Sequence, residues 1–157
     1  LSSFYQNLDK TFQQTRYFFF AERNFHLKGN HYFNMKAESA MLDSDGEITT
    51  NELFRIGGYN SLRGFNEQSL FTDFYAFGGI EYRYLVSNQA FFDVFGQLAN
   101  VRNSTLKTTS KLYSFGLGFN FLLPIGLMTF QISNGQEFNN PFKFQDTKIH
   151  WGIISKF

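Results

Sequence analysis

The sequence predicts an all-β protein, and more narrowly a transmembrane antiparallel β-barrel to whose wall this chain contributes seven strands. Apolar and polar residues alternate with a period of two over seven segments, as in strands that bury one face. Aromatic residues make up 20% of the chain, with 23 Phe and 8 Tyr. Short turns and longer polar connections alternate between the segments. Short turns at one end and long loops at the other are typical of outer-membrane barrels.

The predicted strands follow from this alternation, in order along the chain. They cover residues 16–27, 32–42, 74–86, 90–100, 112–122, 128–133 and 148–157. The clearest alternation places Tyr113, Phe115, Leu117, Phe119 and Phe121 on one face and Ser114, Gly116, Gly118 and Asn120 on the other. The strands have roughly the length of ~9–11 residues that crosses a bilayer at a tilt. Residues 1–14 lack a clean period, so we expect a loop there.

The connections between the predicted strands fall into two lengths. Short turns lie at Lys28, Ser87 and Pro124, and the longer polar connections cover residues 43–73, 101–110 and 136–146. Because the short turns of such barrels are periplasmic, we expect the C-terminus on the periplasmic side of a bacterial outer membrane. A soluble antiparallel sandwich would alternate similarly, but we would expect it to have less regular loop lengths and fewer aromatic residues on its apolar face.

Composition argues against several other classes. A mean hydropathy of −0.28 suits a wall that alternates lipid-facing and lumen-facing positions. The longest apolar run, residues 119–130, is interrupted and falls short of the roughly 20 residues of a spanning helix. A net charge of +1 gives no basic field suited to nucleic acid. The chain begins at Leu1 without an apolar leader, so we expect its targeting signal to lie elsewhere.

The sequence predicts no metal site, no cofactor site and no catalytic site. Without cysteine, the chain has neither a disulfide framework nor a thiolate metal site. The three histidines, His26, His31 and His150, lack metal-ligand spacing.

The most informative stretch is the signature loop, residues 54–65, read as F-R-I-G-G-Y-N-S-L-R-G-F. It lies inside the longest connection and holds Arg63 between Leu62 and Gly64. Its glycines allow positive φ angles at two tight points, which indicates a folded loop and not a slack one.

The signature loop resembles that of the outer-membrane barrel assembly and translocation superfamily, which includes BamA, TamA and the two-partner secretion transporters. The signature there is G-G-x-x-S-[VLI]-R-G-[FY] after a strand, and the matching residues are Gly57, Gly58, Ser61, Leu62, Arg63, Gly64 and Phe65. Barrels of this superfamily have about sixteen strands, and the loop lies five strands from the end. The resemblance implies that residues 1–157 are the C-terminal part of a barrel domain of the bacterial surface antigen type.

Arg63 is the candidate site residue within this loop. A loop arginine is usually solvated, but here it stands between tight glycine turns, with carboxylates predicted to point inward from the next two strands. A desolvated arginine persists where carboxylates pair with it. The resemblance implies a loop clamp of Arg63, Glu81 and Asp93 that holds the loop inside the barrel and supports the active conformation. The family usually has glycine two residues after this aspartate, where the chain has Phe95.

The last predicted strand carries two further expectations. Gly152 either weakens pairing and permits a kink or is a packing glycine. The resemblance implies that this strand pairs loosely with the first strand of the barrel and forms half of a lateral gate for client strands. Phe157 is similar to the C-terminal recognition signal of outer-membrane proteins, although Ser155 stands where that signal prefers an apolar residue.

Seven strands would leave two open sheet edges, which lipid does not tolerate. We therefore expect either the remainder of a larger barrel or an oligomer partner to close the wall.

The resemblance implies outer-membrane protein insertion or protein translocation in a Gram-negative bacterium, of the BamA/TamA kind. That role needs neither a cofactor nor an external energy source. The expected partners are outer-membrane lipid, client outer-membrane or secreted proteins, and periplasmic or lipoprotein accessory subunits. Two alternatives stay open: a passive outer-membrane pore or transporter, and a barrel anchor for an upstream secreted enzyme domain.

Overall fold

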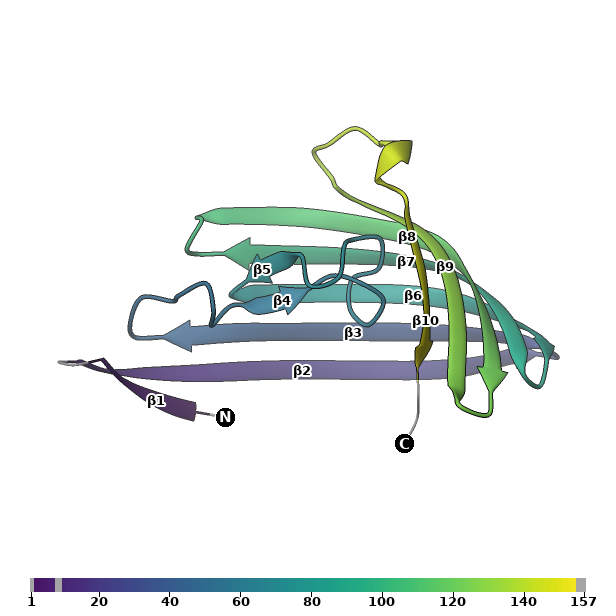
Figure 1. Cartoon of the computed structure of the whole chain (residues 1–157), viewed down its shortest axis with the longest axis horizontal. Coiled ribbons are helices and arrows are strands. Elements are labelled where there is room, and N and C mark those ends of the chain that lie inside the picture. The colour runs from purple at the N-terminus through teal and green to yellow at the C-terminus, as the bar shows by residue number, and fades with distance from the viewer. Residues whose placement is uncertain (1, 8–9, 155–157) are drawn as a thin grey trace.

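One curved antiparallel sheet dominates the computed structural model, which describes residues 2–7 and 10–154 (Figure 1). The sheet has eight strands in the order β1-β2-β3-β6-β7-β8-β9-β10. Their bounds are β1 Ser2–Asn7, β2 Lys10–Lys28, β3 His31–Ser44, β6 Phe74–Ser87, β7 Ala90–Asn103, β8 Thr108–Leu123, β9 Gly126–Glu137 and β10 Lys148–Ile154. The seven predicted strands are all present, and β1 adds an eighth. Figure 1 shows the sheet curving until β9 and β10 run across the direction of β2.

Two predicted loops are wrong in extent. The expected loop over residues 1–14 contains β1 and the beginning of β2, which pair from Ser2↔Thr15 to Asn7↔Lys10. The expected loop over residues 101–110 shrinks to the turn between β7 and β8, because these strands remain paired as far as Asn103↔Thr108. In both places backbone hydrogen bonds join the strands, although the sequence shows no apolar alternation there. Lipid imposes that alternation only on the part of a strand that lies inside the bilayer.

The two faces of the sheet differ in the way a barrel wall requires. We call the face covered by the connection between β3 and β6 the inner face, and the opposite face the outer face. Large apolar side chains are exposed on the outer face, among them Tyr17, Ile80, Val94, Leu98, Leu117, Ile132 and Trp151. Polar side chains are buried on the inner face, among them Glu81, Asp93, Gln97, Asn120 and Gln131. An apolar outside and a polar inside is the arrangement of a transmembrane barrel.

A small apolar core lies between the inner face and the long connection. The connection forms a hairpin of two short strands, β4 (Phe54–Ile56) and β5 (Leu70–Thr72). Its side chains pack on β3, β6, β7 and β8 in a buried cluster made of Ala40, Ile56, Leu62, Tyr75, Phe77, Ala99 and Leu112. This cluster holds the signature loop against the wall, as Figure 1 shows for β4 and β5 in front of β6 and β7.

The connection between β9 and β10 contains the short 3₁₀ helix η1 (Phe144–Asp146). The side-chain amides of Asn134 and Gln136, both on β9, donate hydrogen bonds of 3.0 Å to the Lys143 carbonyl. The connection is thereby fixed beside the part of β9 that β10 does not pair. Along the described ranges, no helix has the length and apolar character needed to span a membrane. Within the same ranges β1 and β10 each pair with one strand, so the sheet stays open.

Candidate functional site

The signature loop is shaped by its glycines. Gly57 and Gly58 have φ angles of +113° and +93°, which only glycine adopts without strain. The Ser61 hydroxyl accepts a 2.8 Å hydrogen bond from the Gly57 amide, and the Leu62 carbonyl accepts one of 3.1 Å from the Gly58 amide. These bonds close a tight turn that drives Leu62 into the core, where it is 0% exposed.

The second tight point brings the loop onto the backbone of β9. Gly64 has φ +87°, and a Cβ added there would lie 2.7 Å from the Asn134 carbonyl carbon. A Cβ on Gly135 would in turn lie 2.5 Å from the Phe65 ring. Two glycines on facing segments therefore allow this contact, and Phe65 packs on the apolar core.

Arg63 points from the loop to two carboxylates on the inner face. Its Nη1 atom lies 2.8 Å from Glu81 Oε2 on β6 and 3.9 Å from Asp93 Oδ1 on β7. The three side chains are 13%, 9% and 4% exposed, so the group is largely desolvated. The structure thus brings together the three residues of the expected loop clamp.

Each carboxylate has a further partner. Arg83 on β6 donates from Nε to Glu81 Oε1, and Asn120 on β8 donates a 2.5 Å hydrogen bond to Asp93 Oδ2. Two arginines and two carboxylates make this cluster formally neutral. Mutual compensation allows Arg63, Glu81 and Asp93 to remain inside the wall at low exposure, while Arg83 is 32% exposed.

Two clamp neighbours were missed from the sequence. Phe95 places its ring under the guanidinium, with Arg63 Cζ 3.5 Å from the ring centre. Gln97 holds the loop backbone, because its Oε1 accepts a 2.9 Å hydrogen bond from the Arg63 amide and its Nε2 donates one of 3.2 Å to the Ser61 carbonyl. Both lie on the inner face of β7 with Asp93, and the period of two is the signal that could have found them.

The glycines of β8 make room for the clamp. Phe95 pairs with Gly116 and Asp93 pairs with Gly118 across the β7–β8 ladder. A Cβ on Gly116 would lie 2.7 Å from the Phe95 ring, and one on Gly118 would lie 2.7 Å from Asp93 Cγ. Phe95 therefore fits into an unbroken β7–β8 ladder, because the neighbouring strand provides the space.

The connection is anchored at its two ends as well as its centre. At the entrance, Glu52 accepts hydrogen bonds of 2.7 Å from the Thr49 amide and 2.8 Å from the Gln14 side chain on β2. Burial alone would raise the pKa of Glu52, but these bonds and the Arg16 charge outweigh it and lower that pKa. At the exit, buried Asp73 accepts hydrogen bonds of 2.9 and 2.8 Å from Arg102.

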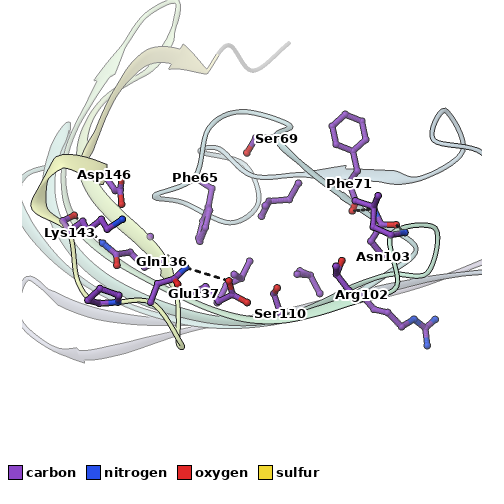
Figure 2. Close-up of a pocket in the computed structure, with 18 residues that line it drawn as sticks. Phe65, Ser69, Phe71, Arg102, Asn103, Ser110, Gln136, Glu137, Lys143 and Asp146 are labelled. Carbon is purple, nitrogen blue, oxygen red and sulfur yellow. Dashed lines mark hydrogen bonds between the residues drawn. The ribbon is translucent and has the colours of Figure 1, made fainter.

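A cavity of about 490 Å³ lies beside the signature loop, between it and the ends of β7, β8 and β9 (Figure 2). Phe65, Ser69 and Phe71 border it from the connection, and Ser110, Gln136 and Glu137 from the wall. Lys143 and Asp146 approach it from the β9–β10 connection. The inner face thus holds open space next to a loop fixed at three points.

The remaining predicted residues lie in or beyond β10. Gly152 pairs with Thr129 in a register that runs unbroken from Lys148 to Ile154, and a Cβ there would meet nothing within 4 Å. Phe157 and Ser155 lie outside the described residues. Over the described part of the chain, no group of three or more His, Cys, Asp or Glu side chains is arranged to hold a metal ion.

Comparison with known proteins identifies a family for the chain. The family model described as the Omp85 superfamily domain matches residues 2–157. No curated protein matches the chain.

Proposed function

The chain belongs to the Omp85 superfamily, and from this premise we propose that it is part of a BamA/TamA-like protein that inserts other proteins into a bacterial outer membrane. The superfamily implies an outer-membrane β-barrel and protein insertion or translocation in general. The narrower BamA/TamA-like role is our proposal, as is the assignment of residues 1–157 to the C-terminal part of the barrel domain.

The observation that carries the proposal is the pairing of Arg63 with Glu81 at 2.8 Å. A loop that served merely to join two strands would not need an arginine buried against carboxylates on the wall. Leaving one partner of a buried pair uncompensated costs about 3–5 kcal/mol. We propose that this interaction keeps the signature loop inside the lumen, so that the wall keeps the shape in which a client can be received.

Client strands would be received by backbone pairing. β10 is the last strand of the sheet order, and its seven residues pair with β9 on one side. A sheet edge in this position can add an extended segment through main-chain hydrogen bonds. We propose that β10 templates client strands in this way, with Gly152 easing release because glycine packs weakly against its neighbours. The chemistry is hydrogen bonding, and it requires no cofactor.

The turns support a proposed orientation of the barrel in the membrane. Those between β2 and β3, β6 and β7, and β8 and β9 are short and lie at one end of the sheet. Short turns of bacterial barrels face the periplasm. We propose that this end, to which β10 also runs, is periplasmic, where accessory subunits would meet the protein.

The test compares two arginines of the same connection in the full-length protein. Arg63→Ala removes the proposed clamp, whereas Arg55→Ala removes an exposed arginine that lies over the Phe71 ring at 5.1 Å. The proteins are reconstituted in vesicles of outer-membrane lipid, and an unfolded barrel protein is added as client. We expect Arg63→Ala to slow client folding markedly and Arg55→Ala to leave it at the wild-type rate.

Two outcomes count against the proposal. If Arg63→Ala vesicles fold the client as fast as wild type while the variant barrel itself is intact, the clamp has no part in assembly. If wild-type vesicles conduct ions steadily but never accelerate client folding, the protein is a passive pore.

A further inference from the structure

The outer face carries an apolar groove of about 340 Å³ over β7, β8 and β9. Its base is a row of three side chains, Val94, Leu117 and Ile132, which face each other across the two ladders. They are 52%, 59% and 51% exposed, so the row lies open on the surface. The neighbouring row on the outer face pairs Gly96, which has no side chain, with Phe115.

The β9–β10 connection covers one side of this groove. The Phe142 ring stacks with Phe115 at a centroid distance of 6.1 Å, and Phe144 lines the groove beside it. The Lys143 carbonyl between these two aromatic residues accepts the bonds from Asn134 and Gln136. Hydrogen bonds therefore hold this side of the groove in place against β9.

Next to the groove, near the beginning of β8 and the end of β9, lie a group of stacked aromatic rings and a lysine. Tyr113 stacks with Phe115 at 6.5 Å and meets Phe138 edge-on at 5.2 Å. Lys111 is exposed and lies on the same outer face of β8, because its neighbour Leu112 belongs to the inner core. Aromatic rings followed by a cation mark the level where a bilayer meets water.

We propose that this groove binds an acyl chain of a membrane lipid whose anionic headgroup is held at Lys111. The inference rests on the proposed function to the extent that it takes the outer face to be surrounded by the outer membrane. Water in a groove with this lining would lack hydrogen-bond partners, whereas the surrounding lipid supplies acyl chains. A groove closed on one side holds one chain more firmly than the flat wall beside it does, and a lysine at the interface selects negative headgroups.

The test measures lipid binding to the full-length protein by native mass spectrometry, with phosphatidylglycerol as the anionic probe and phosphatidylethanolamine as the zwitterionic one. Leu117→Trp fills the groove. Leu98→Trp is its matched control, because Leu98 is equally exposed on the outer face at 59% but does not line the groove. We expect Leu117→Trp to weaken binding of both lipids roughly tenfold, as when about two methylene groups leave the groove. Leu98→Trp should bind as wild type does.

The headgroup contact is tested separately. Lys111→Gln should reduce phosphatidylglycerol binding to the phosphatidylethanolamine level, whereas Lys107→Gln in the adjoining β7–β8 turn should change neither. Equal losses for the two tryptophan variants, or a wild-type protein that retains no lipid, would overturn the proposal. So would a change of oligomeric state in Leu117→Trp, which would identify a protein as the occupant. The lipid-binding measurement contains no client protein, so its result is independent of assembly activity. If lipid binds as expected but the protein fails to accelerate client folding in the separate assay, only the proposed function is contradicted.

Discussion

The guanidinium carbon of Arg63 lies 3.5 Å from the centre of the Phe95 ring, so the clamp arginine rests on an aromatic face while its Nη1 atom reaches Glu81. A cation over a ring face is worth about 2 kcal/mol or more when it is desolvated. The ring thus contributes to the contacts that hold Arg63 against the wall.

Phe95→Leu keeps an apolar side chain of similar reach and removes the π face. We expect a loss of about 1–2 kcal/mol in the free energy of unfolding, read from the urea midpoint of the barrel in detergent. Phe92→Leu, on the outer face of the same strand, is the control and should change stability by less. Equal effects of the two substitutions would show that the ring contributes packing alone.

Glu81 should matter more than Asp93. Arg63 lies 2.8 Å from Glu81 and 3.9 Å from Asp93, and Glu81 also accepts from Arg83. Glu81→Gln should therefore cost about 3–5 kcal/mol, as when a buried pair loses one charge. Asp93→Asn should cost less than Glu81→Gln when both variants are measured in urea under the same conditions. The reverse order would place the main anchor of the loop on β7.

Gly118→Ala tests the space that β8 leaves for Asp93. The added Cβ would displace the Asp93 carboxylate, and overpacking of this kind costs about 1–3 kcal/mol. Gly96→Ala is the matched control, because a Cβ there meets its nearest neighbour, the Ser114 carbonyl oxygen, at 4.0 Å. Equal urea midpoints for the two variants would mean that Asp93 moves aside without cost.

Glu52 makes the attachment of the connection to β2 dependent on pH. Its folded pKa is lowered below the ordinary value of 4.5, so its contribution to stability is present above that pH and is lost as pH falls through the folded pKa. The difference in urea midpoint between wild type and Glu52→Gln should be constant near neutral pH and shrink in acid. A difference that grows as the pH falls would contradict the assigned sign.

The alternation of residues such as Tyr113 and Ser114 was enough to predict seven strands, because a lipid-facing wall imposes a period of two. β1 was missed because its pairing with β2 depends on backbone hydrogen bonds that leave no apolar pattern. Arg63, Glu81 and Asp93 were predicted to meet through a resemblance, and they lie together, although their role in assembly stays a prediction. The contacts of Phe95, Gln97 and Gly118 with the clamp were not predicted, because they depend on strand register, which a single sequence does not specify.

The connection that contains η1 also bears on where the proposed pairing of a client strand with β10 would begin. The β9–β10 ladder starts at Lys148↔Ser133, and just before it the chain is tied to β9 through the Lys143 carbonyl. If a client strand adds to the other edge of β10, as proposed, its ladder would end near Lys148, where the β9–β10 ladder also begins. The end of that ladder would then be a fixed stop, from which the residues of the client strand are counted. A slip by one residue would turn every lipid-facing side chain inward, so such a stop would set the register of the product.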